Sequence, residues 1–127
     1  MRVVVTGASG NVGTAVLERL RHSPDVSHIT AVGRRPPEPD DRPSGGVPVT
    51  WRVADMGEDP MDDVLAGADA LVHLAWRFHP TRDERQTWHD NVVGSIQTFA
   101  AAARQGVKTL VYASSVGAYS PGPQTAS

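Results

Sequence analysis

Five short apolar runs alternate with segments of helical periodicity, and this order constrains the fold more than any other feature of the 127 residues. The first run, Arg2–Thr6 (RVVVT), is apolar without alternation, as in a strand buried on both faces of a parallel sheet. The other runs are residues 28–32, 50–53, 70–74 and 109–113. Strands separated by helices form right-handed βαβ units. We therefore expect an α/β, Rossmann-like, doubly wound parallel sheet with strand order 3-2-1-4-5 in a single domain, residues 1–127.

Three segments between the strands have the pattern of helices: residues 12–21, 60–67 and 82–105. Pro60 suits a helix start and Gly67 a helix end. Thr81 and Glu84 have capping-box spacing at the start of the third helix. An apolar stripe then follows that helix, made of Trp88, Val92, Ile96, Phe99 and Ala103. A proline- and glycine-rich stretch at 36–48 is expected to be a surface loop.

Composition excludes several functional classes. The formal net charge is −2 without blocks of like charge, so neither a nucleic-acid nor a membrane-surface partner is indicated. Cysteine is absent, which excludes disulfides and thiolate chemistry. His73, His79 and His89 lack metal-ligand spacing, so we expect no metal site. With no long apolar segment, the expected location is the cytoplasm.

A glycine-rich loop, TGASGNVG at residues 6–13, joins the first strand to the first helix. In a doubly wound sheet, ligands bind beyond the carboxyl ends of the strands. There, Gly7 permits a tight turn, Gly10 lets a pyrophosphate approach the backbone, and Gly13 lets the helix pack closely. The alternative is a glycine-rich turn without a ligand. The first interpretation predicts a dinucleotide site that also includes Ser9, Asn11 and Val12.

The end of the second strand bears on the choice between NAD and NADP. A carboxylate there would bind the ribose hydroxyls of NAD, but the sequence has Gly33, Arg34 and Arg35. Guanidinium groups can bind a 2′-phosphate in a bidentate way. We expect NADP in preference to NAD, the alternative being that the arginines are solvated loop residues.

The spacing G-x-x-G-x-x-G resembles the extended branch of the short-chain dehydrogenase/reductase superfamily, the NAD-dependent epimerase/dehydratase family. Four more segments carry this resemblance: VADM at 53–56, VHLAW at 72–76, NVVGS at 91–95 and GVKTLVYASS at 106–115. The resemblance covers the whole chain, with the motifs in the family's order.

The resemblance implies roles for residues near the cofactor. Asp55 and the backbone amide of Met56 would hold the adenine ring. Asn91 would hold a backbone kink of the long helix and a water molecule. Leu74, Ala75 and Trp76 would lie along the ribose and pyrophosphate, and Ser114 would line the nicotinamide site.

Catalysis in the resembled family is hydride transfer assisted by a tyrosinate, a lysine four residues later and a Ser or Thr on the substrate oxygen. The resemblance gives the last role to Ser115. Tyr112 and Tyr119 are not followed by lysine at that spacing, and Lys108, the single lysine, precedes both. The chain is thus expected to correspond to a C-terminally truncated, N-terminal cofactor-binding part, inactive alone.

The function expected from the resemblance is NAD(P) binding in an epimerase/dehydratase-type oxidoreductase, whose complete form acts on a nucleotide sugar or a related carbonyl or alcohol. The alternative is a non-catalytic NAD(P)-binding or sensing module that regulates a partner. A homodimer through the helix at 82–105 is a further expectation.

Overall fold

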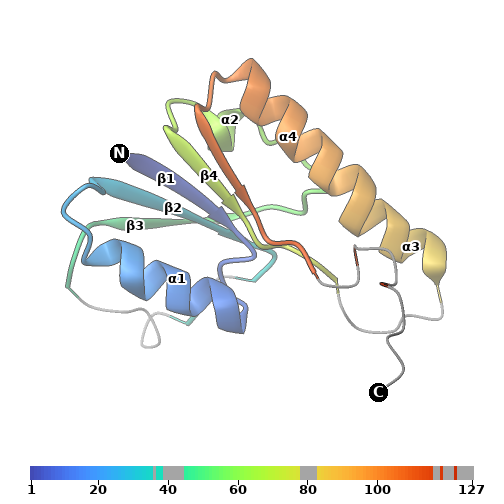
Figure 1. The fold of residues 1–127 in the computed structure, drawn as a ribbon, viewed down its shortest axis with the longest axis horizontal. Coiled ribbons are helices and arrows are strands. Elements are labelled where there is room, and N and C mark those ends of the chain that lie inside the picture. The colour runs from blue at the N-terminus through green and yellow to red at the C-terminus, as the bar shows by residue number, and fades with distance from the viewer. Residues whose placement is uncertain (36, 39–44, 78–82, 116–117, 119–121, 123–127) are drawn as a thin grey trace.

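The computed structural model describes residues 1–35, 37–38, 45–77, 83–115, 118 and 122. These residues form one parallel sheet in the order β3-β2-β1-β4-β5, as predicted (Figure 1). The strands are β1 (Arg2–Thr6), β2 (His28–Gly33), β3 (Val49–Val53), β4 (Ala70–His73) and β5 (Thr109–Tyr112). The switch of strand order lies between β1 and β4, so the carboxyl ends of these two strands mark the expected ligand site.

Two hydrophobic cores lie on opposite faces of the sheet because side chains alternate along each strand. Val4 and Leu71 belong to the core beneath α2 (Asp62–Leu65) and α4 (Gly94–Arg104). Val5 and Ile29 belong to the other core, beneath α1 (Asn11–Arg21). Figure 1 shows α1 on one face of the sheet and α4 on the other.

The second helix is shorter than predicted. It begins at Asp62, with Met61 as its N-cap, so the expected start at Pro60 is wrong. Leu65 is completely buried and anchors the single turn in the core. Gly67 has a φ of +71° and ends the segment in the left-handed region, as its position predicted.

The long helix consists of α3 (Glu84–Trp88), a π-helical turn η2 (His89–Val93) and α4. Its N-cap is Asp83, whose Oδ1 accepts hydrogen bonds from the backbone amides of Arg85 (3.0 Å) and Gln86 (3.2 Å). The predicted capping box is wrong because Glu84 is the first helical residue rather than the third. Thr81, its other member, lies outside the described residues.

The buried face of the long helix is made of small or polar residues, and much of the apolar stripe is exposed. Trp88 and Ile96 of that stripe are 64% and 61% exposed. Phe99 is half-buried, with its ring centroid 5.1 Å from that of His73. The buried residues of the long helix are Asn91, Gly94, Ser95, Thr98, Ala101 and Ala102. Within the described part of the chain, no helix has the length and apolar character needed to cross a membrane.

Candidate functional site

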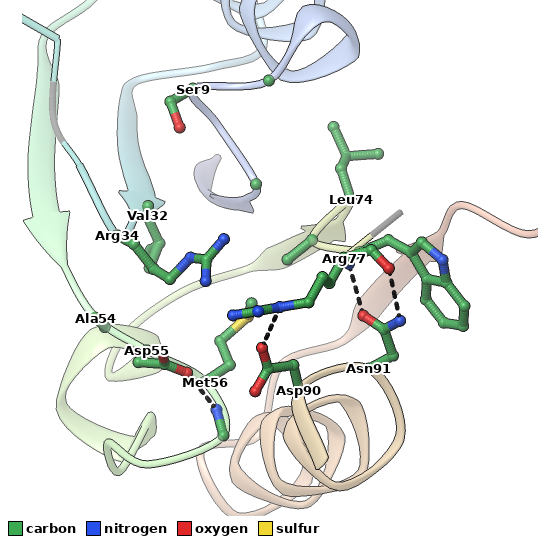
Figure 2. Close-up of a pocket in the computed structure, with 16 residues that line it drawn as sticks. Ser9, Val32, Arg34, Ala54, Asp55, Met56, Leu74, Arg77, Asp90 and Asn91 are labelled. Carbon is green, nitrogen blue, oxygen red and sulfur yellow. Dashed lines mark hydrogen bonds and ion pairs between the residues drawn. The ribbon is translucent and has the colours of Figure 1, made fainter. Parts of the chain in front are cut away.

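A pocket opens beyond the carboxyl ends of β1 to β4, at the edge of the sheet that the topology predicted (Figure 2). Five chain segments build it: the glycine loop, the ends of β2 and β3, the loop after β4, and the π-helical turn. Its lining residues are Gly7, Ser9, Gly10, Val32, Gly33, Arg34, Ala54, Asp55, Met56, Gly57, Leu74, Ala75, Trp76, Arg77, Asp90 and Asn91.

The three glycines of the loop differ in what a side chain at each position would contact. Gly7 has a φ of +68°, and a Cβ there would lie 2.7 Å from the backbone nitrogen of Ala75. A Cβ on Gly13 would lie 2.2 Å from the carbonyl oxygen of Gly7, so α1 can reach the loop only without a side chain. A Cβ on Gly10 would meet one neighbour, the Gly7 oxygen, at 3.4 Å. Gly7 and Gly13 are therefore demanded by packing, whereas Gly10 borders open space.

Gly10 is also the N-cap of α1, and no side chain caps the helix there. The first-turn N–H groups of a helix have no intrahelical partners. Together with the helix dipole they form a binding site for an anion. The helix start thus offers donors beside a backbone that a ligand can approach closely.

The turn after β3 is fixed against the long helix. Asp55 Oδ1 accepts a hydrogen bond from the backbone amide of Gly57 at 3.0 Å. A Cβ on Gly57 would lie 2.9 Å from His89 Nδ1, so this glycine permits close contact with the π-helical turn. Asp55 thereby stands at the pocket wall on a rigid turn.

Arg77 crosses the pocket from the loop after β4. Its Nε lies 2.5 Å from Asp90 Oδ2, an ion pair in which the Nε–H is not aligned as a hydrogen bond. The Asn91 side chain binds the main chain of the same residue: Oδ1 accepts from Arg77 N at 2.6 Å, and Nδ2 donates to Arg77 O at 3.0 Å. Figure 2 shows these contacts at the lower wall.

A buried histidine connects the strands behind the pocket. His73 Nδ1 lies 2.8 Å from Thr6 Oγ1, and Nε2 lies 2.9 Å from Ser95 Oγ. The Ser95 hydroxyl donates its proton to Asn91 O at 2.6 Å, so it accepts from Nε2–H, and Nδ1 accepts from Thr6. Burial lowers the pKa of His73 from 6.5 to about 4, which keeps the ring neutral in this chain of hydrogen bonds. His73 thus links β1 and β4 to the start of α4, where Ser95 in turn bonds the π-helical turn.

The model of the NAD-dependent epimerase/dehydratase family matches residues 3–127. The chain belongs to this family. It is 33% identical over 113 residues to an L-arabinose 1-dehydrogenase (NAD(P)(+)) of Haloferax volcanii, and the match covers 89% of the chain and 40% of that enzyme. It is 30% identical to a UDP-glucose 4-epimerase of Corynebacterium glutamicum, over 94% of the chain and 36% of the relative.

Among solved structures, the uronate dehydrogenase of Agrobacterium tumefaciens superposes with a TM-score of 0.74 at 28% identity. The match covers 90% of the chain and 40% of that structure. A variant of this dehydrogenase was solved in complex with NAD, with the same TM-score and coverage. The chain spans about 40% of the length of these family members.

The pocket brings together most of the cofactor-binding residues predicted from the sequence. They are Gly7, Ser9, Gly10, Arg34, Asp55, Met56, Leu74, Ala75 and Trp76. Asn91, to which the resemblance gives a helix kink and a water molecule, lines the same pocket. Arg35 lies beside it, where it lines a second depression with Ser9 and Arg34. The family motif also predicts a helix irregularity at Asn91, and the π-helical turn contains this residue.

The other predicted site residues do not line the pocket. Asn11 and Val12 are exposed in the first turn of α1, and Gly13 is buried beneath the loop. Ser114 and Ser115 are exposed beyond the end of β5. The backbone oxygen of Ser115 accepts a hydrogen bond from the Ala118 amide at 2.9 Å. The assigned roles of the two serines at the nicotinamide and the substrate stay predictions.

The motifs do not identify Arg77 and Asp90, the charged pair at the lower wall. Each directly follows or precedes a motif of the family, and Asp90 is the neighbour of Asn91. Nothing in their spacing indicates that two residues 13 positions apart form an ion pair, because a loop and a helix turn bring them together. Among the described residues, no group of three or more His, Cys, Asp or Glu could hold a metal ion.

Proposed function

We propose that this pocket binds a nicotinamide dinucleotide, as the cofactor-binding part of an oxidoreductase that acts by hydride transfer. The observation that carries the proposal is the open backbone at Gly10, where α1 begins without a side-chain cap. This arrangement suits a pyrophosphate. The NAD complex of the related uronate dehydrogenase supports the same cofactor class.

The substrate class follows from the relatives. Their names describe enzymes that act on arabinose, UDP-glucose and uronate. We infer that the complete protein acts on a sugar or a nucleotide sugar, oxidising or epimerising a carbinol carbon. In this proposal Ser115 binds the substrate oxygen and Ser114 lies beside the nicotinamide.

We infer a preference for NADP from the end of β2. Arg34 and Arg35 are both exposed there, and they occupy the place where a carboxylate would bind the ribose of NAD. Two guanidinium groups favour a 2′-phosphate, whereas the ribose hydroxyls of NAD are bound best by an acid. The preference predicts tighter binding of NADPH than of NADH.

Within these 127 residues no tyrosine is followed by lysine four positions later. A tyrosine needs a nearby positive charge to exchange protons near neutral pH. We therefore propose that the chain binds the dinucleotide without turning it over. The same absence favours the second candidate, a dinucleotide-binding module that regulates a partner.

Titration of the 127-residue chain with NADPH and NADH, followed by calorimetry, tests the binding proposal. Gly10→Asp is the sharpest variant because Asp is a good N-cap, which preserves α1, yet its carboxylate repels the pyrophosphate. Affinity is expected to fall at least about tenfold, or about 1.4 kcal/mol. Gly10→Asn, equal in size and uncharged, is expected to weaken binding less.

A folded wild-type chain that binds neither dinucleotide would contradict the proposal. Equal affinities for the wild type and Gly10→Asp would show that any binding occurs elsewhere. Steady NADPH oxidation with a sugar aldehyde would contradict only the absence of turnover.

A further inference from the structure

Both the main chain and the side chain of Arg77 are bound by residues of the π-helical turn. Asn91 binds both polar groups of its main chain, at 2.6 and 3.0 Å. Asp90, the preceding residue, pairs with its side chain at 2.5 Å. Two successive residues of the π-helical turn thus fix both the backbone and the guanidinium of one residue. The side chains of Arg77 and Asp90 are only 26% and 12% exposed.

The terminal amino groups of Arg77 face the pocket. Asp90 takes the Nε side, and in Figure 2 the far end of the guanidinium points between Arg34 and Met56. A guanidinium carries five N–H donors in a planar fork, so its outer donors can serve a ligand. The pocket wall therefore contains donors that are fixed in place before a ligand arrives.

This wall lies where the adenosine half of a bound dinucleotide would be. A pyrophosphate at the start of α1 sends the adenosine ribose toward the end of β2, where Arg34 stands, and the base farther toward β3. The Arg77 side chain reaches back from the loop after β4 to this β3 side, beside Met56. The nicotinamide half lies in the other direction along the sheet edge.

Arg77 and Arg34 differ in net charge, and this difference suits them to different parts of the dinucleotide, the adenine base and the 2′-phosphate. Asp90 neutralises Arg77, so the pair presents N–H donors with little net charge. Arg34 has no carboxylate partner among the described residues. A free positive charge suits the 2′-phosphate, and a neutralised donor fork suits the ring nitrogens of adenine, which are hydrogen-bond acceptors.

We propose that Arg77, fixed by Asp90 and Asn91, is a ligand-binding residue that donates hydrogen bonds to the adenine ring of the dinucleotide. This inference rests on the proposed function and adds to it a division of labour. Arg77 contacts the part common to NAD and NADP, and Arg34 contacts the phosphate that distinguishes them. Because Asn91 binds the main chain of Arg77, the loop keeps its anchor when the side chain changes.

Calorimetric titration of AMP, NADH and NADPH into the Arg77→Met chain tests the proposal. All three affinities are expected to fall by a similar factor, about tenfold for the loss of a charged donor's hydrogen bonds. Arg34→Met should weaken NADPH more than NADH. Arg104→Met is the matched control, since Arg104 pairs with Asp62 at 2.8 Å outside the pocket, and it should change none of the affinities.

Removal of Arg77 alone leaves Asp90 without its arginine partner, so Arg77→Met/Asp90→Asn provides a second variant in which this carboxylate is removed as well. It should show the same loss of AMP affinity. Asp90→Asn alone should raise the affinity for NADPH relative to NADH, because the positive charge of Arg77 is then no longer neutralised.

An unchanged AMP affinity in the folded double variant overturns the proposal, as does a loss confined to NADPH. A wild-type chain that does not bind AMP also overturns it. Binding of AMP but not of NADH would contradict the proposed function instead, and the Arg77 variants would still test the adenine contact.

Discussion

β1 and β5 pair with opposite edges of the same strand, yet their surroundings differ completely. Both run parallel to β4, in register with the same residues, Ala70 to His73. In β1, residues 3–6 are at most 3% exposed. In β5 every residue is exposed, with Leu110 at 47% and Val111 at 51%.

The two strands have similar sequences, RVVVT and TLVY, so residue type does not explain the difference. β1 has β2 on its other side and a core on each face, whereas β5 is one of the two edge strands. Tyr112 of β5 contacts the rings of Phe99 and His73, at 5.4 and 5.7 Å between ring centroids. The sequence of a strand therefore sets its conformation, whereas the neighbouring elements set its burial.

The largest effect is expected from a change that forces the glycine loop away from β1. In Gly13→Val the Cβ would lie 2.2 Å from Gly7 O and 2.8 Å from backbone atoms of Ala8. Backbone cannot yield as a side-chain tip can, so the free energy of unfolding should fall by about 3 kcal/mol or more. Urea unfolding measures it, and near-wild-type stability would contradict the close packing of α1 on the loop.

Acid is also expected to lower the free energy of unfolding, through the buried His73 beside β1. Its pKa is about 4 in the folded chain and 6.5 when unfolded. Above pH 6.5 both states are neutral, so the contribution to stability is complete. As the pH falls toward 4, the unfolded chain binds a proton that the folded chain excludes, and about 3 kcal/mol is lost.

Urea unfolding at several pH values between 7 and 4 measures this dependence. His73→Gln cannot titrate, so its stability should change less with pH than that of the wild type, whatever its absolute value. Equal slopes for the two proteins would mean that His73 is not held neutral by burial.

A matched pair of substitutions compares the two strands directly. Val5 is completely buried in β1, and Val111 is 51% exposed in β5. Val5→Ala should lower the free energy of unfolding by about 2 kcal/mol, from lost burial and a new cavity. Val111→Ala should lower it by less than about 0.5 kcal/mol. Equal losses, measured by urea unfolding, would show that β5 is covered in solution.

The smallest effect on stability is expected on the outer face of the long helix. Ile96 is 61% exposed and Trp88, earlier on the same helix, is 64% exposed. Exposed apolar side chains can serve as an association surface. Ile96→Glu should leave the unfolding transition unchanged and reduce any dimerisation through this helix, as measured by sedimentation velocity. Gln97→Glu, on an exposed neighbour, is the charge-matched control, and an equal effect of both variants would place the interface elsewhere.

Local signals predicted the strands, their order and most of the residues that line the pocket. The strand order follows from alternating strands and helices, and Gly7, Gly10 and Gly13 follow from the demands of a strand–turn–helix connection. The errors occurred where a tertiary contact outweighed a local signal. Met61 is 2% exposed, so it belongs to the core and α2 begins after it, not at Pro60. Asp83 caps the long helix in place of the Thr81 and Glu84 pair.

The sequence by itself determined the βαβ order, the glycine loop and the family, because these depend on residue type and spacing along the chain. The tertiary structure alone decided that Arg77 meets Asp90 and Asn91, that His73 joins Thr6 to Ser95, and that β5 is exposed where β1 is buried. These outcomes depend on which distant segments become neighbours. A residue's burial and partners are properties of that packing, and spacing along the chain does not encode them.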